Sequence, residues 1–124
     1  MNRFSDKYII TKDIDWEELG GGVSRKFLGY DNQIMMVKVK FEKGALGAPH
    51  QHFHTQATYC ISGKFEFEID GEKKIVEAGD GVYIEPNLLH SAVCLEEGML
   101  IDTFSPVRED FLSGGKVSYF GNDS

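Results

Sequence analysis

Apolar and polar residues alternate with a period of two along much of this chain, as they do in half-buried β-strands. The run IMMVKVKFEKG, residues 34–44, places Val37, Val39 and Phe41 on one face and then breaks at a glycine. Since side chains of equal parity point to the same side of a strand, these three residues are predicted to face a core. The segment is therefore expected to be one strand of a sheet.

A β-hairpin is the clearest local prediction. In KFEFEIDGEKKIVEAGD, residues 64–80, three apolar residues alternate with three acidic ones. The pair Asp70-Gly71 suits the two-residue turn that joins hairpin strands, and Ile75 and Val76 lie on the returning strand. One face of the hairpin should be wet and the other buried, the buried residues being Phe65, Phe67 and Ile69.

The rest of the chain predicts more strands and almost no helix. GVYIEP, HSAVCLE and MLIDTFSPV are further short runs, each bounded by Gly, Pro, Asn or a pair of acids. The one helical candidate is the turn or two in DIDWEEL, residues 13–19, which Asp13 would cap. Many short strands predict an all-β fold, either a sandwich or a small antiparallel barrel. We expect one domain over residues 1–124, with its core within residues 20–112 and a peripheral N-terminal segment and C-terminal tail, SGGKVSYFGNDS.

Composition narrows the possible functions. The 124 residues are 41% hydrophobic, which is enough for a core. The balance of 13 basic against 20 acidic residues gives a net charge of −7, the wrong sign for a protein that binds nucleic acid. The first residues lack the apolar core of a signal peptide and no stretch suits a membrane span, so a cytoplasmic location is expected. Cys60 and Cys94 do not form a disulfide framework and are interpreted as small hydrophobic residues.

The histidines carry the strongest indication of chemistry. Three of the four, His50, His52 and His54, are spaced two apart, and Gln56 continues the same parity. On a regular strand these side chains would project together and gather nitrogen and oxygen donors suited to a divalent metal ion. His90, which follows a Pro-Asn turn and opens another strand, would supply a further donor across a barrel. Each histidine alone suits a surface or packed position, but together they predict a metal site.

A second candidate region is MLIDTFSPV with the residues that follow it. Asp102 shares its parity with Leu100 and Phe104, which puts an acid on an inward, apolar face. Two interpretations stay open for Asp102: a strand end in water, or a general acid or base beside the metal. Arg108 likewise is either a surface charge paired with a neighbouring acid or a group that binds an anion.

The chain resembles the cupin superfamily of small metal-binding β-barrels. The first cupin motif is met in full by Gly44, His50, His52, Gln56 and Gly63. The second is met in part by Gly79 and His90, and it departs from the usual residues at Glu85, Asn87 and Cys94. The resemblance implies the metal ligands His50, His52, Gln56 and His90 and leaves His54 as a spare or a substrate contact.

Gln56 stands where most metal cupins have glutamate. Three imidazoles and an amide are all neutral, so the metal would keep its full charge for Lewis-acid work on an anionic substrate. A ligand set without an anion also supports higher oxidation states less well, which disfavours oxygen chemistry. The plain alternative is that Gln56 only forms hydrogen bonds inside the barrel.

The chain also looks like the KdgF group of cupins, the pectin-degradation proteins. The similarity runs from WEELGGGVSRKFL through PHQHFHTQATY to DTFSPVREDF, over some 100 residues. It implies metal-dependent ring opening of 4,5-unsaturated monouronates, from pectin or alginate, to the linear 5-keto-4-deoxyuronate. The active-site residues implied are Asp102, Phe104 and Arg108.

The same resemblance implies a divalent cofactor, with zinc, nickel, iron and manganese all open. The substrate would be a small anionic sugar, with no nucleic acid or membrane as partner, and exposed edge strands suggest a homodimer. Two other functions stay open. One is a non-catalytic cupin that binds a small acid or sugar, and the other is a metal dioxygenase.

Overall fold

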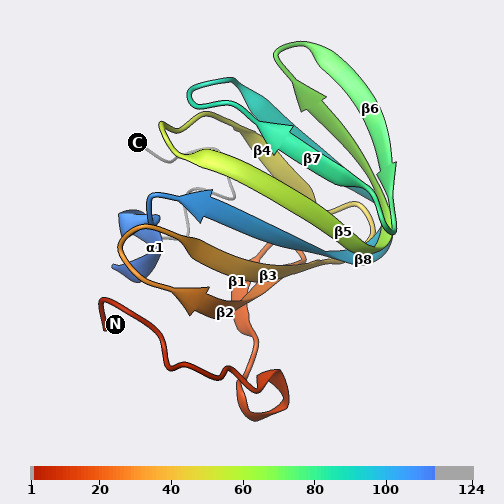
Figure 1. The fold of residues 1–124 in the computed structure, drawn as a ribbon. Coiled ribbons are helices and arrows are strands. Elements are labelled where there is room, and N and C mark those ends of the chain that lie inside the picture. Colours follow the sequence, from red (N-terminus) through yellow and green to blue (C-terminus); the bar gives the residue numbers. More distant parts are fainter. Residues whose placement is uncertain (1, 114–124) are drawn as a thin grey trace.

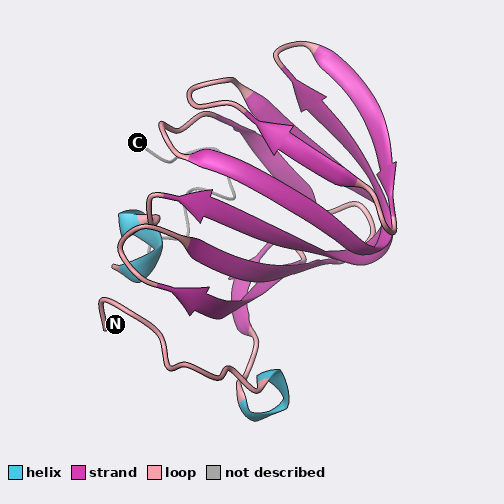
Figure 2. Cartoon of the chain, in the orientation of Figure 1, coloured by secondary structure: helices cyan, strands magenta, loops and turns pink. Residues whose placement is uncertain are grey.

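Antiparallel strands make up most of the protein, whose structure is a computed structural model that describes residues 2–113 (Figures 1 and 2). Within this range the only helical segments are the 3-10 turn Thr11–Asp13 and α1, Glu109–Leu112. The strands are β1 (Glu17–Gly20), β2 (Val23–Tyr30), β3 (Met35–Phe41), β4 (Leu46–His50), β5 (Thr55–Ile69), β6 (Glu72–Glu77), β7 (Gly81–Ile84) and β8 (His90–Ser105). The predicted all-β fold is confirmed.

The eight strands form one sheet that folds over itself into two layers. The first layer has the order β1-β2-β3-β8-β5-β7 and uses residues 99–105 of β8 and 55–60 of β5. The second layer has the order β4-β8-β5-β6 and uses residues 90–94 of β8 and 64–69 of β5. Both long strands therefore belong to both layers, and Figure 1 shows them curving together at one end of the molecule.

Two glycines allow the long strands to bend at the same place. Gly63 in β5 has a φ of +85°, which L side chains rarely adopt, and the register between the strands shifts on either side of it. A Cβ on Gly63 would lie 2.6 Å from the Cα of Gly98, and a Cβ on Gly98 would overlap the carbonyl of Ser62. The two backbones thus touch where the sheet turns from one layer to the other.

The prediction of separate strands in HSAVCLE and MLIDTFSPV is wrong, because both belong to the continuous strand β8. The acids Glu96 and Glu97, which suggested a break, are exposed on the outside of the bend. The backbone stays paired with β5 there, through Lys64 to Glu96 and Ser62 to Met99.

The predicted helix in DIDWEEL is also wrong. Its first residue closes the 3-10 turn, without the expected side-chain cap, and its last three residues begin β1. Cross-strand pairs explain the preference for strand: Glu17 accepts a hydrogen bond of 2.8 Å from Arg25 Nε, and Glu18 accepts one of 3.1 Å from Ser24 Oγ. Glu17 and Glu18 therefore bind the neighbouring strand.

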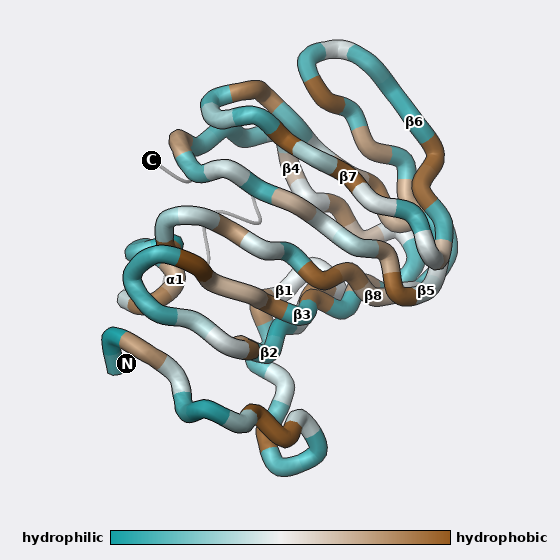
Figure 3. The backbone as a smooth tube through the Cα atoms, viewed as in Figure 1, coloured by the Kyte–Doolittle hydropathy of each residue, from teal (hydrophilic) through white to brown (hydrophobic). Residues whose placement is uncertain are grey.

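The core lies between the two layers. Val37 and Val39 are fully buried in the first layer, and Phe41 packs edge-on against Phe65 of the second, with 5.3 Å between ring centroids. Figure 3 shows apolar and polar positions alternating along the strands. Cys60 and Cys94 are buried free thiols, as predicted.

The predicted hairpin is confirmed in β5 and β6, which pair from Lys64–Glu77 to Ile69–Glu72. Asp70 and Gly71 both have positive φ, 49° and 87°, which is the geometry of a type I′ turn. Of the apolar residues, Phe65, Phe67 and Val76 are buried, whereas Ile75 is exposed.

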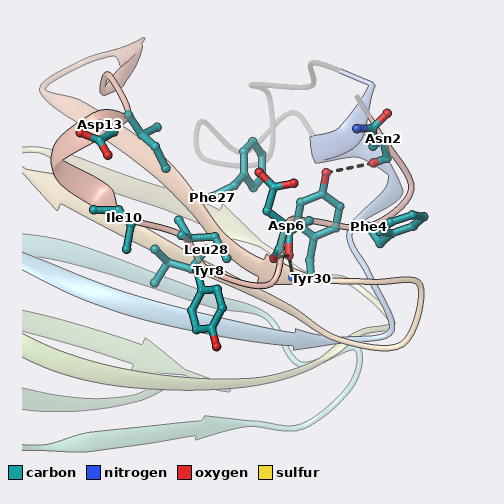
Figure 4. Close-up of a pocket in the computed structure, with 12 residues that line it drawn as sticks. Asn2, Phe4, Asp6, Tyr8, Ile10, Asp13, Phe27, Leu28 and Tyr30 are labelled. Carbon is teal, nitrogen blue, oxygen red and sulfur yellow. Dashed lines mark hydrogen bonds between the residues drawn. The ribbon is translucent and has the colours of Figure 1, made fainter.

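The N-terminal segment lies along β2 and leaves an open hollow between them (Figure 4). Tyr30 fixes this segment, because its hydroxyl donates to the carbonyl of Asn2 at 2.9 Å and its N–H donates to Ser5 Oγ at 3.0 Å. Phe4 and Tyr8 remain exposed beside the hollow. Most of the predicted tail, residues 114–124, lies outside the described residues. None of the helices in residues 2–113 has the length and apolar character needed to cross a membrane.

The bend gives a first testable prediction. Gly63→Ala should lower the free energy of unfolding by about 3 kcal/mol or more, because an unfavourable φ adds to a clash with the backbone of β8. Gly71→Ala is the matched control: its φ is +87° but no atom lies within 4 Å of the added Cβ, so it should cost about 1–2 kcal/mol. Urea unfolding measures both, and equal losses would show that the close contact at Gly63 contributes nothing.

Candidate metal centre

Three histidines meet at one end of the space between the layers. His50 ends β4 and pairs in register with His90, which begins β8, and their ring centroids are 4.3 Å apart. His52 follows in the turn after β4, 5.0 Å from the ring of His90. One nitrogen from each ring lies within 4.8 Å of the other two, so the three histidines are positioned to hold a metal ion.

The backbone that brings these histidines together differs from the predicted strand. A single regular strand through residues 50–56 is wrong: β4 ends at His50, residues 51–54 cross between the layers, and β5 begins at Thr55. The N–H of Asn87 donates to the carbonyl of His52 at 2.7 Å and holds this crossing in place. Asn87 has a φ of 68°, a conformation that asparagine tolerates, which explains why it can stand where the second motif usually has glycine.

Backbone carbonyls orient the three rings. The Nδ1 atoms of His50, His52 and His90 lie 2.8, 3.2 and 2.9 Å from the carbonyl oxygens of Ala48, His54 and Leu88. An Nδ1–H that donates to a carbonyl leaves the lone pair on Nε2, which is the arrangement of histidine ligands in metal proteins. Nε2 of His90 is buried and has no hydrogen-bond partner among residues 2–113. A metal ion would satisfy this atom, so the cluster fits the divalent ion that the motif predicts.

Burial also keeps the rings of His52 and His90 neutral. It lowers the pKa of His52 to about 3, with further lowering by the positive charge of Arg108. It lowers the pKa of His90 to about 4, with a contribution from His50. Neutral imidazoles are the form that binds a cation, and here protons do not compete for the ring nitrogens near neutral pH.

Gln56 faces the cluster from β5. Its Oε1 is 3.1 Å from His52 Nε2, while its Nε2 donates to Thr58 Oγ1 at 3.0 Å and to Asp102 Oδ1 at 3.3 Å. With His52 Nδ1–H donating to the carbonyl of His54, an oxygen lone pair and a nitrogen lone pair face each other at 3.1 Å. A cation accepts both, so the donor set present at this end of the cavity is three imidazoles and one amide oxygen.

Asp102 lies on the inward face of β8, opposite Thr58 of β5. It is buried, which rules out the alternative of a strand end in water. Its Oδ1 accepts a hydrogen bond of 2.6 Å from Thr58 Oγ1. Burial raises the pKa of Asp102 to about 6, although Thr58 and Arg108 both act in the opposite direction.

Arg108 is a buried charge and not the surface charge of the plain alternative. Its Nε and Nη2 donate to the two carboxylate oxygens of Asp110 at 3.0 and 2.9 Å. Its guanidinium carbon also lies 4.3 Å from the ring centroid of Phe111 and 5.0 Å from that of Phe104. A neighbouring acid does pair with Arg108, as that alternative required, but the pair stands at the edge of the core.

One cavity joins these groups. Its lining combines metal-binding, carboxylate, aromatic and guanidinium side chains, and includes His50, Gln56, His90, Asp102, Phe104 and Arg108. The hollow beside the N-terminal segment, by contrast, is lined by none of them (Figure 4).

His54 is not one of the three histidines whose nitrogens converge, although its ring lies edge-on to that of His52 with 5.4 Å between centroids. Its Nε2 is 3.2 Å from the carbonyl oxygen of Val107, and its ring stacks on Phe53 with 4.0 Å between centroids. The parity that predicted a common direction fails for His54, because residues 51–54 are not a strand.

One residue of the site, Thr58, was missed at the sequence level. Thr58 shares the parity of Gln56 and could have been found by extending that run by one step. The pairing of Arg108 with a neighbouring acid was one of the alternatives left open, and that acid is Asp110.

Metal content tests the cluster. The purified protein should hold one divalent ion per chain, and His52→Ala or His90→Ala should lower occupancy strongly while circular dichroism shows a retained fold, because each removes a ligand. His54→Ala is the matched control and should keep full occupancy. Full metal content in both ligand variants, measured by elemental analysis, would contradict the assignment.

Comparisons with known proteins agree with this geometry. The sequence matches the cupin domain family over residues 37–103. It is 49% identical over 108 residues to the pectin degradation protein KdgF of Dickeya dadantii, an alignment that covers 86% of this chain and 98% of that protein. Among solved structures, an RmlC-like cupin from Shewanella frigidimarina superposes with a TM-score of 0.87 at 42% identity, covering 89% of this chain and 99% of that one. KdgF from a Halomonas species superposes with a TM-score of 0.83 at 38% identity, covering 86% and 99%. The chain is a cupin and belongs to the KdgF family of pectin-degradation proteins.

Proposed function

We propose that this protein opens the ring of 4,5-unsaturated monouronates, derived from pectin or alginate, to the linear 5-keto-4-deoxyuronate. One observation carries the proposal: a buried carboxylate, Asp102, lines the same cavity as a histidine cluster suited to a metal ion and a buried guanidinium. The identity with KdgF over most of the chain supports the same reaction.

The reaction is an isomerisation that needs proton transfer and no redox change. The substrate is a cyclic hemiacetal whose ring oxygen is attached to C5 of the C4–C5 double bond. Loss of the proton from the C1 hydroxyl forms the C1 aldehyde and breaks the bond between C1 and the ring oxygen. The electron pair moves onto that oxygen as an enolate, and a proton added at C4 gives the C5 ketone.

Asp102 is assigned the proton transfer. Both of its hydrogen bonds, from Thr58 and Gln56, fall on Oδ1, and we assign Oδ2 to the C1 hydroxyl of the substrate. Burial, which raises its pKa to about 6, makes Asp102 a stronger base than an ordinary aspartate.

Arg108 is assigned the C6 carboxylate. Its guanidinium lines the same cavity as Asp102 and the histidine cluster, and a guanidinium can bind a carboxylate through paired hydrogen bonds. Phe104, which lies beneath the guanidinium and lines the cavity, would pack against the sugar ring. Together they give an acidic protein a local positive site for an anion.

His50, His52, Gln56 and His90 would hold the metal ion. These neutral donors suit zinc, nickel, iron or manganese, and we propose a divalent ion without preference among them. When bound, such an ion supplies Lewis-acid stabilisation of the negative charge that develops on oxygen during ring opening.

A non-catalytic carrier of small acids is the second candidate that the cavity allows. A carboxylate among the groups that contact an anion would weaken binding by like-charge repulsion. The position of Asp102 therefore favours the enzyme.

Replacement of the proposed base tests the mechanism. Asp102→Asn keeps the side-chain shape and should keep both fold and metal, but turnover of unsaturated galacturonate should fall by about 10²–10⁴ because proton transfer is lost. The loss of the substrate's ultraviolet absorbance, corrected for the slow spontaneous reaction, gives the rate. Wild-type turnover by Asp102→Asn would remove it from the proton-transfer role.

Replacement of the proposed anion-binding residue tests recognition. Arg108→Lys should raise KM for unsaturated uronates by about 10–100-fold, because an ammonium cannot form the paired hydrogen bonds of a guanidinium. Stability should fall as well, since Arg108 packs between Phe104 and Phe111. Asp110→Asn is the control: it removes the charge of the partner but keeps the guanidinium, and its KM should stay near the wild-type value. An unchanged KM in Arg108→Lys would exclude Arg108 from substrate binding.

A further inference from the structure

Thr58 stands at the centre of the polar network behind the histidine cluster. It lies on the inward face of β5, is buried, and pairs in register with Asp102 of β8. Its hydroxyl donates to Asp102 Oδ1 at 2.6 Å and accepts from Gln56 Nε2 at 3.0 Å. One hydroxyl thus contacts both the proposed base and the proposed amide ligand.

We propose that Thr58 is a positioning residue that fixes which end of the Gln56 amide faces the metal site. An amide can turn over and exchange its oxygen and nitrogen at almost no steric cost. The end of the Gln56 amide that points away from His52 contacts two acceptors, the Thr58 hydroxyl oxygen and the Asp102 carboxylate. Only the NH2 group can donate a hydrogen bond to both. The carbonyl oxygen is therefore turned toward His52 Nε2.

The hydroxyl is needed because the carboxylate alone holds the amide weakly. The contact from Gln56 Nε2 to Asp102 Oδ1 is 3.3 Å, longer than the 3.0 Å contact to Thr58. The Thr58 hydroxyl also donates a hydrogen bond to Oδ1 of Asp102, so the same group orients the carboxylate toward the cavity. Loss of the hydroxyl should disturb the metal ligand and the base together, without removing either.

The part of this inference that concerns Asp102 and turnover rests on the proposed function, whereas the part that concerns Gln56 and the metal does not. Two measurements separate them. Zn²⁺ affinity, from competition with a chelator, and the visible spectrum of the Co²⁺-loaded protein report on the ligand in the absence of any sugar. The kinetics with unsaturated galacturonate report on the base.

Thr58→Val removes the hydroxyl and keeps the branched shape. We expect Zn²⁺ affinity to fall about tenfold or more and kcat to fall about 10–100-fold, with KM changed much less, as is usual when a partner of a metal ligand is lost. The Co²⁺ spectrum should shift because the amide oxygen is no longer held at the metal. Thr58→Ser restores the hydroxyl and should restore affinity, spectrum and kcat.

Thr103→Val is the matched control, since Thr103 neighbours Asp102 on β8 with the opposite parity and points away from the cavity. It should leave all three readouts unchanged. Should Thr58→Val fail to fold, Thr58→Ala provides the same test with a smaller side chain.

A double-mutant cycle gives the strictest form of the test. If Thr58 acts through Gln56, Thr58→Val should lower Zn²⁺ affinity no further in a Gln56→Ala background. Equal losses from Thr58→Val in both backgrounds, or wild-type affinity and spectrum in Thr58→Val alone, would overturn the proposal. If the wild-type protein turned over no uronate, the proposed function would fail, while the Zn²⁺ and Co²⁺ measurements would still decide the role of Thr58.

Discussion

The antiparallel pairing of β5 with β8 is the interaction on which both the fold and the site depend. Each strand spans both layers, and the bend at Gly63 and Gly98 brings the two halves of each strand face to face. His90 at the start of β8 and Asp102 near its end would lie far apart on a straight strand, at about 3.3 Å per residue. On the bent strand they line one cavity. Close contact of two glycine backbones is thus what places a histidine of the cluster and a buried acid in one cavity.

The cavity combines neutral donors with two charges of opposite sign. Burial holds His52 and His90 neutral, which suits them to bind a cation, and it raises the pKa of Asp102, which suits that residue to exchange a proton. The positive charge of Arg108 favours binding of an anion in this cavity, although the protein as a whole has a net charge of −7. The donors proposed for the ion are all neutral, so a bound ion would keep its full charge for an anionic substrate.

Much of the fold could be predicted from the sequence where local pattern and tertiary structure agree. The alternation around Val37 and the turn at Asp70-Gly71 are local properties, and both are confirmed. The errors occur where a distant contact overrides the local preference. The adjacent acids Glu96 and Glu97 predicted a break between strands, yet β8 continues because β5 keeps its backbone paired there. DIDWEEL was predicted to form a helical turn or two capped by Asp13, yet cross-strand partners for Glu17 and Glu18 favour a strand.

The candidate site shows the same division. The spacing of His50, His52 and His90 predicted their association, although the predicted strand geometry was wrong and the turn 51–54 brings them together instead. The inward position of Asp102 followed from parity alone. The pairing of Arg108 with a neighbouring acid was one of the alternatives, but its burial was not foreseen. The bridge from Thr58 to Asp102 could not be predicted, because it depends on a side-chain distance that only the folded chain defines.

The central claim is that this cavity converts a cyclic unsaturated uronate to its linear keto form. Proton NMR of unsaturated galacturonate with the metal-loaded protein tests it most directly, because the C1 and C4 protons report separately on the hemiacetal and the double bond. The account predicts that both signals disappear together, faster than in protein stripped of metal, while signals of the linear product grow. Broadened substrate signals without conversion would contradict it and identify the protein as a binder of uronates.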